Sequence, residues 1–194
     1  TSEAMSYNLG NQLWHSDSSF KKIPARASLL SGREVPPVGG ETEFADMRAA
    51  WEALDTERQA WLADKVAMHS LAHSRGLMGY DADKTFTDTE KAEVPPVPQP
   101  MMFENPNTHR KALYVGSHAF AIDGMPEDEG YTIIRELIEH ATQPQFVYAH
   151  KWRAGDLVMW DNRASLHRGR PWDGQRYRRV MRRTTVAGPE TVAA

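Results

Sequence analysis

Short β-rich runs separated by turn signals fill the last fifty residues of the chain. The runs QFVYAHKW, DLVMWDN, ASLHR and RRVMRRTTV follow Pro144, and the turns AGD, the Asn162-Arg163 corner and RPWDGQ separate them. Successive short strands of this kind pair into an antiparallel barrel or sandwich. We therefore predict a mainly β protein whose helices flank the strands.

The first part of the chain mixes strands with helices. The segments 26–35 and 112–122 have the β-branched and apolar composition of strands. Asp46 and Asp55 each precede a helical pattern, MRAAWEAL and TERQAWLADK, and Asp is a preferred N-cap residue. A longer helix is predicted after Pro126, where acidic residues precede apolar positions at helical spacing.

Two irregular segments interrupt this pattern. VPPVGG at 35–40 predicts a turn, because paired prolines and paired glycines continue neither helix nor ladder. The stretch from Gly76 to Arg110 has little periodicity, and VPPVPQP at 94–100 favours extended polyproline geometry. Because long loops in compact domains are usually lids or binding loops, we predict a mobile lid over residues 74–110 of a single domain, 1–194.

Composition narrows the classes of function. The chain has 194 residues, of which 40% are hydrophobic and 25% charged, and it contains no cysteine, so disulfides, thiolate metal sites and a Cys nucleophile are excluded. Its net charge of -3 predicts no nucleic-acid partner, although arginines concentrate between Arg163 and Arg183. No apolar run reaches the roughly 18 residues of a membrane span, and the amino end has no signal-peptide pattern, so we expect a cytoplasmic protein without a membrane partner.

Histidines and one aspartate supply the candidate metal ligands. His15 and Asp17 are two apart, and on a strand they would point to the same face. This pair alone is a weak signal, but His167 in the β-rich segment would complete a two-His, one-carboxylate triad of the kind that binds Fe(II). His69 and His73 are four apart, as for a helical metal clamp, but HSLAH lacks the glutamate of a zinc-protease motif.

Two arginines follow His167 at strand spacing. Period-2 alternation predicts that Arg178 and Arg182 share one face of RRVMRRTTV, while Arg179 and Arg183 point the other way. Two guanidinium groups directed into a barrel would need anions, because unpaired buried charge is unfavourable. A cosubstrate and a substrate that each carry an acidic group would supply them.

The sequence at this point resembles the Fe(II)/2-oxoglutarate-dependent oxygenases of the taurine and 2,4-dichlorophenoxyacetate dioxygenase family. Four blocks carry the resemblance in the family's order over residues 11 to 185: NQLWHSDSSF, PPVGGETEFADMRAAWEAL, GDLVMWDNRASLHRG and the arginine run that ends in RRTT. Each block alone would be a weak match. The resemblance implies a double-stranded β-helix, the jelly-roll fold.

The resemblance also implies roles for individual residues. Fe(II) would be held by His15, Asp17 and His167, 2-oxoglutarate by Arg178 and the hydroxyl of Thr42, and the acidic group of the substrate by Arg182, with Asn11 nearby. Trp160, Asp161 and Asn162 are interpreted as scaffolding. Four further residues are candidates for contacts in the substrate pocket: His69, His73, Ser74 and His118.

The implied reaction consumes 2-oxoglutarate and O2, hydroxylates a small anionic substrate and releases succinate and CO2. The blocks around NQLWHSDSSF and EFADMRAAW look closer to the phenoxyacetate enzymes, so we expect an aryloxyalkanoate that is cleaved to a phenol and a 2-oxo acid. A taurine-like sulfonate or an alkyl sulfate is the alternative substrate, and a cupin-type metal protein without oxygenase activity is the alternative class. Family members carry a segment before the HxD motif, so we expect that this chain lacks it; homo-oligomerisation stays open.

Overall fold

The first of two facing sheets contains the long strand of the amino-terminal half. The computed structural model describes residues 10–79 and 94–188. In this sheet the strands are antiparallel and follow the order β11-β1-β9. Leu30 at its centre pairs with Arg183 on one side and with Val158 on the other. The strands are β1 (Ala25–Glu34), β9 (Leu157–Asp161) and β11 (Val180–Ala187).

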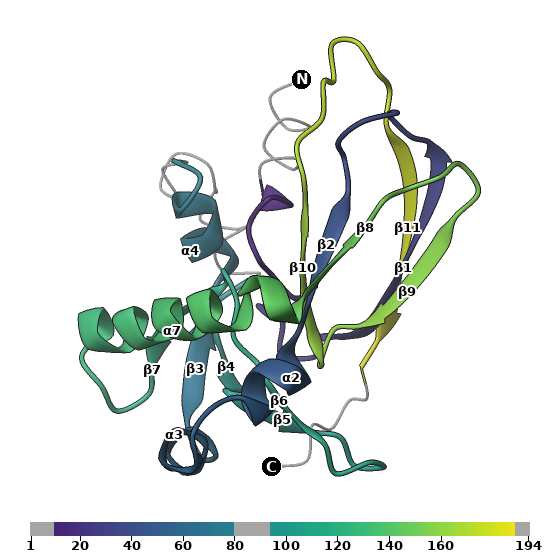
Figure 1. Ribbon diagram of the computed structural model, residues 1–194. Coiled ribbons are helices and arrows are strands. Elements are labelled where there is room, and N and C mark those ends of the chain that lie inside the picture. Colours follow the sequence, from purple (N-terminus) through teal and green to yellow (C-terminus); the bar gives the residue numbers. More distant parts are fainter. Residues whose placement is uncertain (1–9, 80–93, 189–194) are drawn as a thin grey trace.

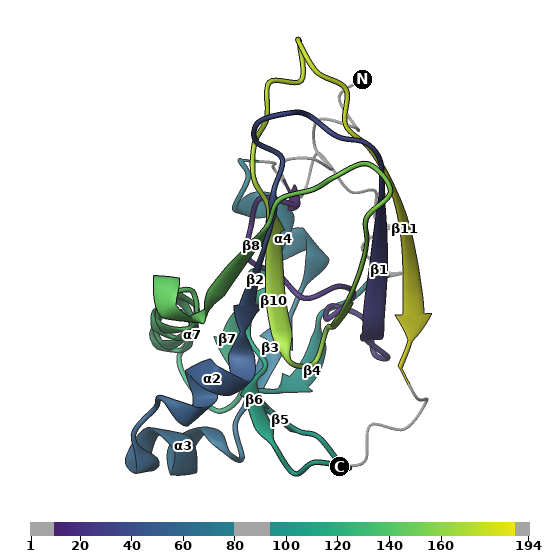
Figure 2. The same cartoon turned by 45° about the vertical axis from the view of Figure 1, so that its right-hand side comes forward.

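The second sheet faces the first, as Figure 2 shows. Its antiparallel strands follow the order β10-β2-β8, and Phe44 lies between His167 and Tyr148 in the register. An isolated bridge joins His15 to His167, so the segment around residue 15 continues this sheet beyond β10. The strands are β2 (Thr42–Asp46), β8 (Val147–His150) and β10 (Ser165–Gly169).

Smaller strands and short helices form the other half of the molecule (Figure 1). A third sheet has the order β4-β3-β7, and a hairpin pairs β5 with β6. These strands are β3 (Val66–His69), β4 (Val97–Pro100), β5 (Met102–Glu104), β6 (Lys111–Leu113) and β7 (Ala119–Ile122). The short helix α4 (Leu71–Gly76) follows β3 directly.

Both predicted aspartate caps are confirmed. Oδ1 of Asp46 accepts hydrogen bonds from the backbone N–H groups of Arg48 and Ala49, at the start of α2 (Met47–Glu52). Oδ1 of Asp55 accepts from the N–H of Arg58, at the start of α3 (Thr56–Leu62). Each carboxylate thus satisfies N–H groups that have no partner within the helix.

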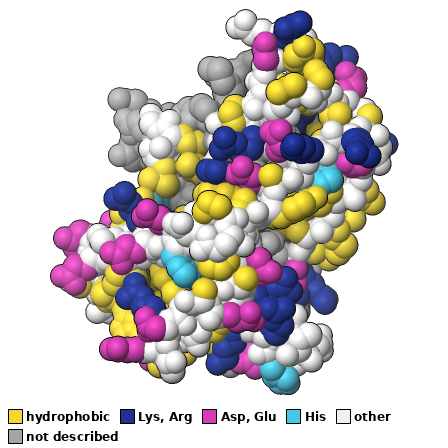
Figure 3. Space-filling view, in the orientation of Figure 1, with side chains coloured by type: hydrophobic (Ala, Val, Ile, Leu, Met, Phe, Trp, Pro, Cys, Tyr) yellow, Lys and Arg dark blue, Asp and Glu magenta, His cyan; other side chains and the backbone are white. Residues whose placement is uncertain are grey.

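The predicted long helix is α7 (Glu127–Ala141), and a 3₁₀ turn, η1 (Pro144–Phe146), follows it. Three acidic residues occupy its first turn, and Figure 3 shows acidic side chains gathered at the left, at this end of α7. Their negative charges interact favourably with the positive end of the helix dipole. Gly130 lets the helix approach β7 closely. A Cβ at this position would lie 2.8 Å from the backbone nitrogen of Ile122, which is too close for any other residue without a shift of the helix.

The second sheet separates the hydrophobic core from the space between the two sheets. Because side chains alternate along a strand, Ala45 and Leu166 point to the core while Phe44 and His167 point toward the first sheet. On the core side, Ile134 and the other buried apolar side chains of α7 belong to one hydrophobic cluster with side chains of β3, β6 and β7. The same two strands therefore contribute to the core with one face and to the facing-sheet interior with the other.

Most predicted elements are confirmed, and two need correction. The predicted strand at 112–122 is two strands, β6 and β7, with 114–118 between them. The predicted aperiodic excursion contains β4 and β5, and Met101 between them is fully buried. Residues 80–93 of the predicted lid lie outside the described residues, so closure of 74–110 stays a prediction. Among the helices that the structure describes, none is long and apolar enough to cross a membrane.

Candidate metal centre

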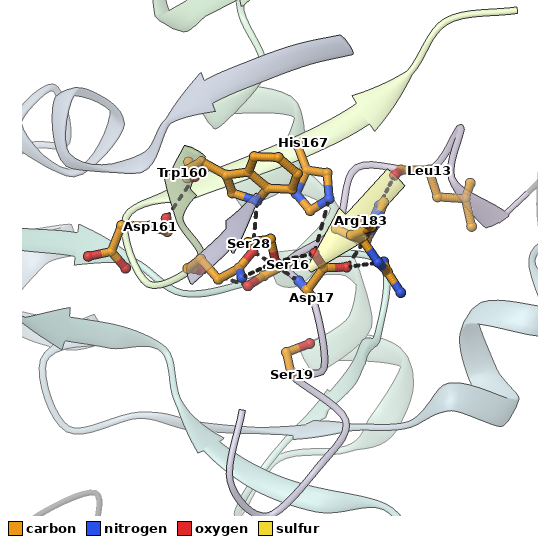
Figure 4. Close-up of polar contacts among 12 residues, drawn as sticks. Leu13, Ser16, Asp17, Ser19, Ser28, Trp160, Asp161, His167 and Arg183 are labelled. Carbon is orange, nitrogen blue, oxygen red and sulfur yellow. Dashed lines mark hydrogen bonds and ion pairs between the residues drawn. The ribbon is translucent and has the colours of Figure 1, made fainter. Parts of the chain in front are cut away.

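Three ligand-type side chains meet between the two facing sheets. His15, Asp17 and His167 are all buried, and one ligand atom from each lies within 4.8 Å of the other two. The bridge between His15 and His167 brings the amino-terminal segment to β10, so residues 152 positions apart become neighbours. Nε2 of His15 lies 3.9 Å and Nε2 of His167 3.7 Å from the carboxylate of Asp17 (Figure 4).

The two imidazoles are prepared to donate lone pairs. Nδ1 of His15 donates to the backbone carbonyl of Leu13 at 2.7 Å, so its Nε2 keeps a lone pair that faces Asp17. Burial lowers the pKa of His15, and burial together with the charge of His15 lowers the pKa of His167 to about 3. Both rings are therefore neutral at neutral pH, which is the form that binds metals.

A hydrogen-bond network fixes the carboxylate of Asp17. The hydroxyl of Ser28 donates to its Oδ2 at 2.6 Å, and Nδ2 of Asn162 donates to that hydroxyl at 2.9 Å. Burial alone would raise the pKa of Asp17, but His167, His15, the Ser28 hydrogen bond and Arg183 together lower it. Asp17 therefore offers an anionic, fixed oxygen donor between two neutral nitrogen donors.

Asn162 connects three segments around the triad. Its Oδ1 accepts from the indole N–H of Trp160 at 2.9 Å and from the backbone N–H of Asp17 at 3.3 Å, while its backbone carbonyl accepts from Ser16 at 2.7 Å. Residues of this WDN stretch thus support the ligands. Ser28 was not among the predicted site residues, because a serine within a strand carries no signal of its own in the sequence.

A cavity of about 270 Å³ opens between the sheets next to the triad. His15 and His167 line it, together with Thr42 from β2 and Arg179 and Arg183 from the carboxyl-terminal arginine run. Asn11, which was predicted to lie near the substrate, also lines this cavity. Two cations and a hydroxyl beside three ligand-type side chains make a space suited to a small anion.

The predicted assignment of the arginines is wrong by one residue. The side chain of Arg178 is 79% exposed and lies 3.5 Å from Glu34, and Arg182 lines neither this cavity nor the one on the other side of the triad. Arg179, Met181 and Arg183 line the cavity instead, so the alternation is present but its phase is reversed. Nη1 of Arg183 donates to Oδ1 of Asp17 at 3.0 Å.

The error has a simple physical cause. Sequence reasoning counted eleven and fifteen residues from His167, whereas the loop between β10 and β11 places the inward arginines twelve and sixteen residues after it. A shift of one residue along a strand moves every side chain to the opposite face. The length of the irregular loop therefore determines which arginines face the cavity, and the periodicity within the strand does not report that length.

Arg179 is held by its surroundings in a position to bind an anion. Its Nε donates to the carbonyl of Gly40 at 3.2 Å, and its guanidinium lies 5.3 Å from the ring centre of Trp172. Gly40 has a positive φ, and a Cβ there would lie 3.1 Å from Cδ of Arg179, so the predicted 35–40 turn leaves room for the arginine. Burial lowers the pKa of Arg179, which is a sign of a desolvated cation.

A second cavity, of about 180 Å³, lies on the Asp17 and His118 side of the triad. Three of the predicted pocket residues line it, namely Asn11, Ser74 and His118. Arg183 borders both cavities. It therefore stands where an anion bound in either space would be next to the triad.

The other two predicted pocket histidines do not line either cavity. Nδ1 of His69 lies 3.1 Å from the hydroxyl of Ser19, which in turn lies 3.1 Å from Nδ1 of His118. His73 packs its ring against Phe120. His69 thus reaches the cavity only through Ser19 and His118, and its burial lowers its pKa to about 4.

Two antiparallel sheets with a buried His, Asp, His set between them define a β protein of the kind that can hold one metal ion on three side chains. A comparison with family models then identifies the chain itself. Residues 1–185 match the model described as taurine catabolism dioxygenase TauD, TfdA family. The chain belongs to this family, as the resemblance in the sequence implied.

Two similar relatives are named for phenoxy acids. The chain is 48% identical over 179 residues to the alpha-ketoglutarate-dependent 2,4-dichlorophenoxyacetate dioxygenase of Cupriavidus pinatubonensis, and covers 61% of that protein with 92% of its own length. It is 39% identical over 182 residues to the (S)-phenoxypropionate/alpha-ketoglutarate-dioxygenase of Sphingobium herbicidovorans, of which it covers 63% with 92% of its own length. The chain thus spans about three fifths of the length of these relatives.

A solved structure supports the fold. The crystal structure of AAD-2 in complex with Mn(II) and N-oxalylglycine superposes with a TM-score of 0.91 at 54% sequence identity. The match covers 98% of this chain and 74% of that one. The described arrangement of strands is therefore the arrangement of a known protein of this type.

Proposed function

We propose that the protein is an Fe(II)- and 2-oxoglutarate-dependent oxygenase with a double-stranded β-helix fold. The geometry of His15, Asp17 and His167 carries this proposal, because two neutral imidazoles and one fixed carboxylate within 4.8 Å of one another match the donor set of such iron sites. The two facing sheets, β11-β1-β9 and β10-β2-β8, support the jelly-roll arrangement. When bound, Fe(II) with 2-oxoglutarate and O2 supplies the oxidising power and releases succinate and CO2.

Arg179 takes the role that was predicted for Arg178. Together with Thr42, it would bind the distal carboxylate of 2-oxoglutarate. Both line the 270 Å³ cavity beside the two histidines, and the guanidinium of Arg179 is largely desolvated. A carboxylate there would receive a charged hydrogen bond from Arg179 and a neutral one from the Thr42 hydroxyl.

Arg183, in place of Arg182, is the proposed residue for the acidic group of the substrate. It borders the cavity that Asn11, Ser74 and His118 also line, so a substrate anion bound to it would place the neighbouring carbon close to the triad. The named activities of the relatives support an aryloxyalkanoate as that substrate. The side chains of this cavity would then orient the carbon next to the ether oxygen.

Hydroxylation of that carbon explains the cleavage. The product is a hemiacetal, in which the carbon bears both the new hydroxyl and the ether oxygen. Loss of the hydroxyl proton and of the aryloxide as leaving group gives a phenol and a 2-oxo acid, glyoxylate from an aryloxyacetate and pyruvate from an aryloxypropionate. The chain's residues contribute by binding, orientation and exclusion of water.

Two alternatives have different products. An alkylsulfonate such as taurine, or an alkyl sulfate, would also satisfy Arg183, since a sulfonate or sulfate accepts the same hydrogen bonds as a carboxylate. A cupin-type metal protein without oxygenase activity would use the triad and neither arginine. The proposals of a cytoplasmic location and a single domain rest on the sequence alone, and cell fractionation and limited proteolysis would test them.

A product assay distinguishes these functions. The whole protein is incubated with Fe(II), ascorbate and 2-oxoglutarate, together with 2,4-dichlorophenoxyacetate, a 2-aryloxypropionate, taurine or a short alkyl sulfate. We expect succinate and a phenol with the aryloxy acids. Sulfite from taurine without any phenol would overturn the substrate class, and absence of succinate with every substrate would overturn the oxygenase itself.

Adjacent arginines provide matched controls for the revised roles. Arg179→Ala should raise the KM for 2-oxoglutarate by about 100-fold, because a buried carboxylate loses a charged partner worth about 3 kcal/mol, while exposed Arg178→Ala should change it little. Arg183→Ala should raise the KM for the aryloxy acid, and Arg182→Ala should not. Larger effects from Arg178 and Arg182 would restore the original assignment.

A further inference from the structure

The hydroxyl of Thr42 has a second partner that no role in the proposed reaction uses. The indole N–H of Trp152 donates to Oγ1 of Thr42 at 3.0 Å. Thr42 lies on β2, is 3% exposed and lines the cavity of about 270 Å³ that Arg179 also lines. Trp152 lies in the segment between β8 and β9 and does not line that cavity.

The indole of Trp152 is fixed from several sides. Its ring meets the ring of His150 edge-on, with 4.5 Å between centres, and His150 is hydrogen-bonded through Nε2 to Asp156 at 3.0 Å. The carboxylate of Asp156 also accepts from the backbone N–H of Arg153 at 2.9 Å. On the other side, a Cβ at Gly32 would lie 3.3 Å from the indole, so the ring is packed against β1.

This contact determines which way the Thr42 hydroxyl can act. An indole N–H only donates, so the oxygen of Thr42 accepts this bond with one of its two lone pairs, and its own hydrogen points away from the indole. Among the described residues the Thr42 hydroxyl makes no other hydrogen bond. Arg179 is a donor too, and its guanidinium has no acceptor function. The Thr42 and Arg179 end of the cavity therefore offers hydrogen-bond donors.

We propose that Trp152 is a positioning residue that occupies one of the two acceptor sites of the Thr42 hydroxyl and so favours its donation into the cavity, which makes this end of the cavity favour a carboxylate over a carboxamide. The inference rests on the proposed function, because it assigns this subsite to the distal carboxylate of 2-oxoglutarate. A carboxylate accepts at both oxygens. A carboxamide brings an NH2 group, which would face the donors of Arg179 and would compete with the indole N–H for the Thr42 oxygen.

Binding of the cosubstrate tests the proposal without turnover. The Kd of 2-oxoglutarate is measured by calorimetry on the whole protein loaded with Mn(II), for wild type and for Trp152→Phe, which keeps an aromatic ring and loses the N–H. We expect a rise of about 3- to 10-fold, from loss of one oriented neutral hydrogen bond. In steady state the KM for 2-oxoglutarate should rise while kcat stays within about twofold.

A double-mutant cycle separates positioning from a general effect on packing. Thr42→Val removes the hydroxyl, so in that background Trp152→Phe should have almost no further effect on the Kd. Trp61→Phe on α3 is the matched control, because its indole packs against Arg58 and Lys65 away from the cavity. It should leave the Kd unchanged. Equal effects of Trp152→Phe with and without the Thr42 hydroxyl would overturn the proposal.

Selectivity gives a second measurement that packing alone would not change. The ratio of the Kd of 2-oxoglutaramate, the distal amide, to that of 2-oxoglutarate should be at least about 3-fold smaller in Trp152→Phe, because a hydroxyl released from the indole can accept from the amide NH2. If Trp152→Phe does not fold, Thr42→Val should lower the same ratio, since one of the opposing donors is gone. An unchanged ratio in the variant that folds overturns the proposal.

The two levels of inference fail differently. Wild-type protein that binds Mn(II) but no 2-oxoglutarate would contradict the proposed function and this inference with it. Wild-type binding that Trp152→Phe leaves unchanged would contradict the inference alone.

Discussion

At the scale of single residues, one hydroxyl supports the candidate metal ligand Asp17. The hydroxyl of Ser28 connects Oδ2 of Asp17 to Nδ2 of Asn162, so one small residue fixes the orientation of the central carboxylate. Partners of this kind orient ligands and strengthen metal binding even though they do not touch the ion.

Ser28→Ala tests this support. We expect about 10- to 100-fold weaker binding of Mn(II) or Fe(II), the usual range for loss of an outer hydrogen bond at a metal site. Metal titration followed by calorimetry measures it. Ser31→Ala on the same strand, which makes no hydrogen bond to Asp17, is the control and should bind metal as wild type does. Unchanged affinity in Ser28→Ala would mean that Asp17 needs no support from the Ser28 hydroxyl.

At the scale of elements, the contact between α7 and β7 depends on a missing side chain. Gly130 is buried in the first part of α7, and a Cβ there would lie 2.8 Å from the nitrogen of Ile122. Ordinarily alanine favours a helix over glycine by about 1 kcal/mol. Here the close approach of α7 to β7 leaves no room for the methyl group, so alanine is expected to be less favourable than glycine at this position.

We predict that Gly130→Ala lowers the free energy of unfolding by about 1 to 3 kcal/mol, in the range for overpacked positions. Urea unfolding followed by circular dichroism measures the change. Glu139→Ala, at an exposed position of the same helix, should change it by less than about 0.5 kcal/mol. A more stable Gly130→Ala variant would show that α7 can move away from β7 without loss.

Sequence patterns predicted those elements whose stabilising contacts lie within one segment of the chain. The caps at Asp46 and Asp55 and the periodicity of α7 could be found because the hydrogen bonds and the apolar stripe belong to single segments. The strand β4 was missed because VPQP gains its pairing from β3, which no local pattern reports.

The site could be predicted only in part for the same reason. HxD and His167 were recognisable through the family resemblance, and the structure places them together. The inward arginines could not be assigned, because their phase depends on the loop between β10 and β11. Trp152 also gave no signal, since its partner Thr42 is 110 positions away.

On the scale of the whole molecule, buried neutral histidines make stability depend on pH. Burial lowers the pKa of His69 to about 4, holds that of His118 well below its usual value, and lowers that of His73 as well. Their folded-state pKa values lie below the unfolded value of about 6.5. The unfolded chain therefore binds more protons than the folded one below pH 6.5, and stability must fall as the pH decreases from there.

We predict that one histidine buried as deeply as His69 lowers the free energy of unfolding of the metal-free protein by about 2 kcal/mol as the pH falls from 7 to 5. Urea denaturation at fixed ionic strength across that range measures the slope. In His69→Gln, which does not titrate, the slope should be shallower by roughly that amount. A wild-type stability that stays constant from pH 7 to pH 5 would contradict the lowered pKa values.

The division of the second sheet into two faces has a consequence for how the protein can diverge. Neighbouring residues of β10, such as Leu166 and His167, are under different constraints. Leu166 is constrained by the packing of the hydrophobic core, and His167 by the chemistry between the sheets. A complete substitution scan of β2 and β10 should therefore show losses of foldedness and losses of turnover at alternating positions. New substrate ranges could then arise on one face of these strands while the other preserves the architecture.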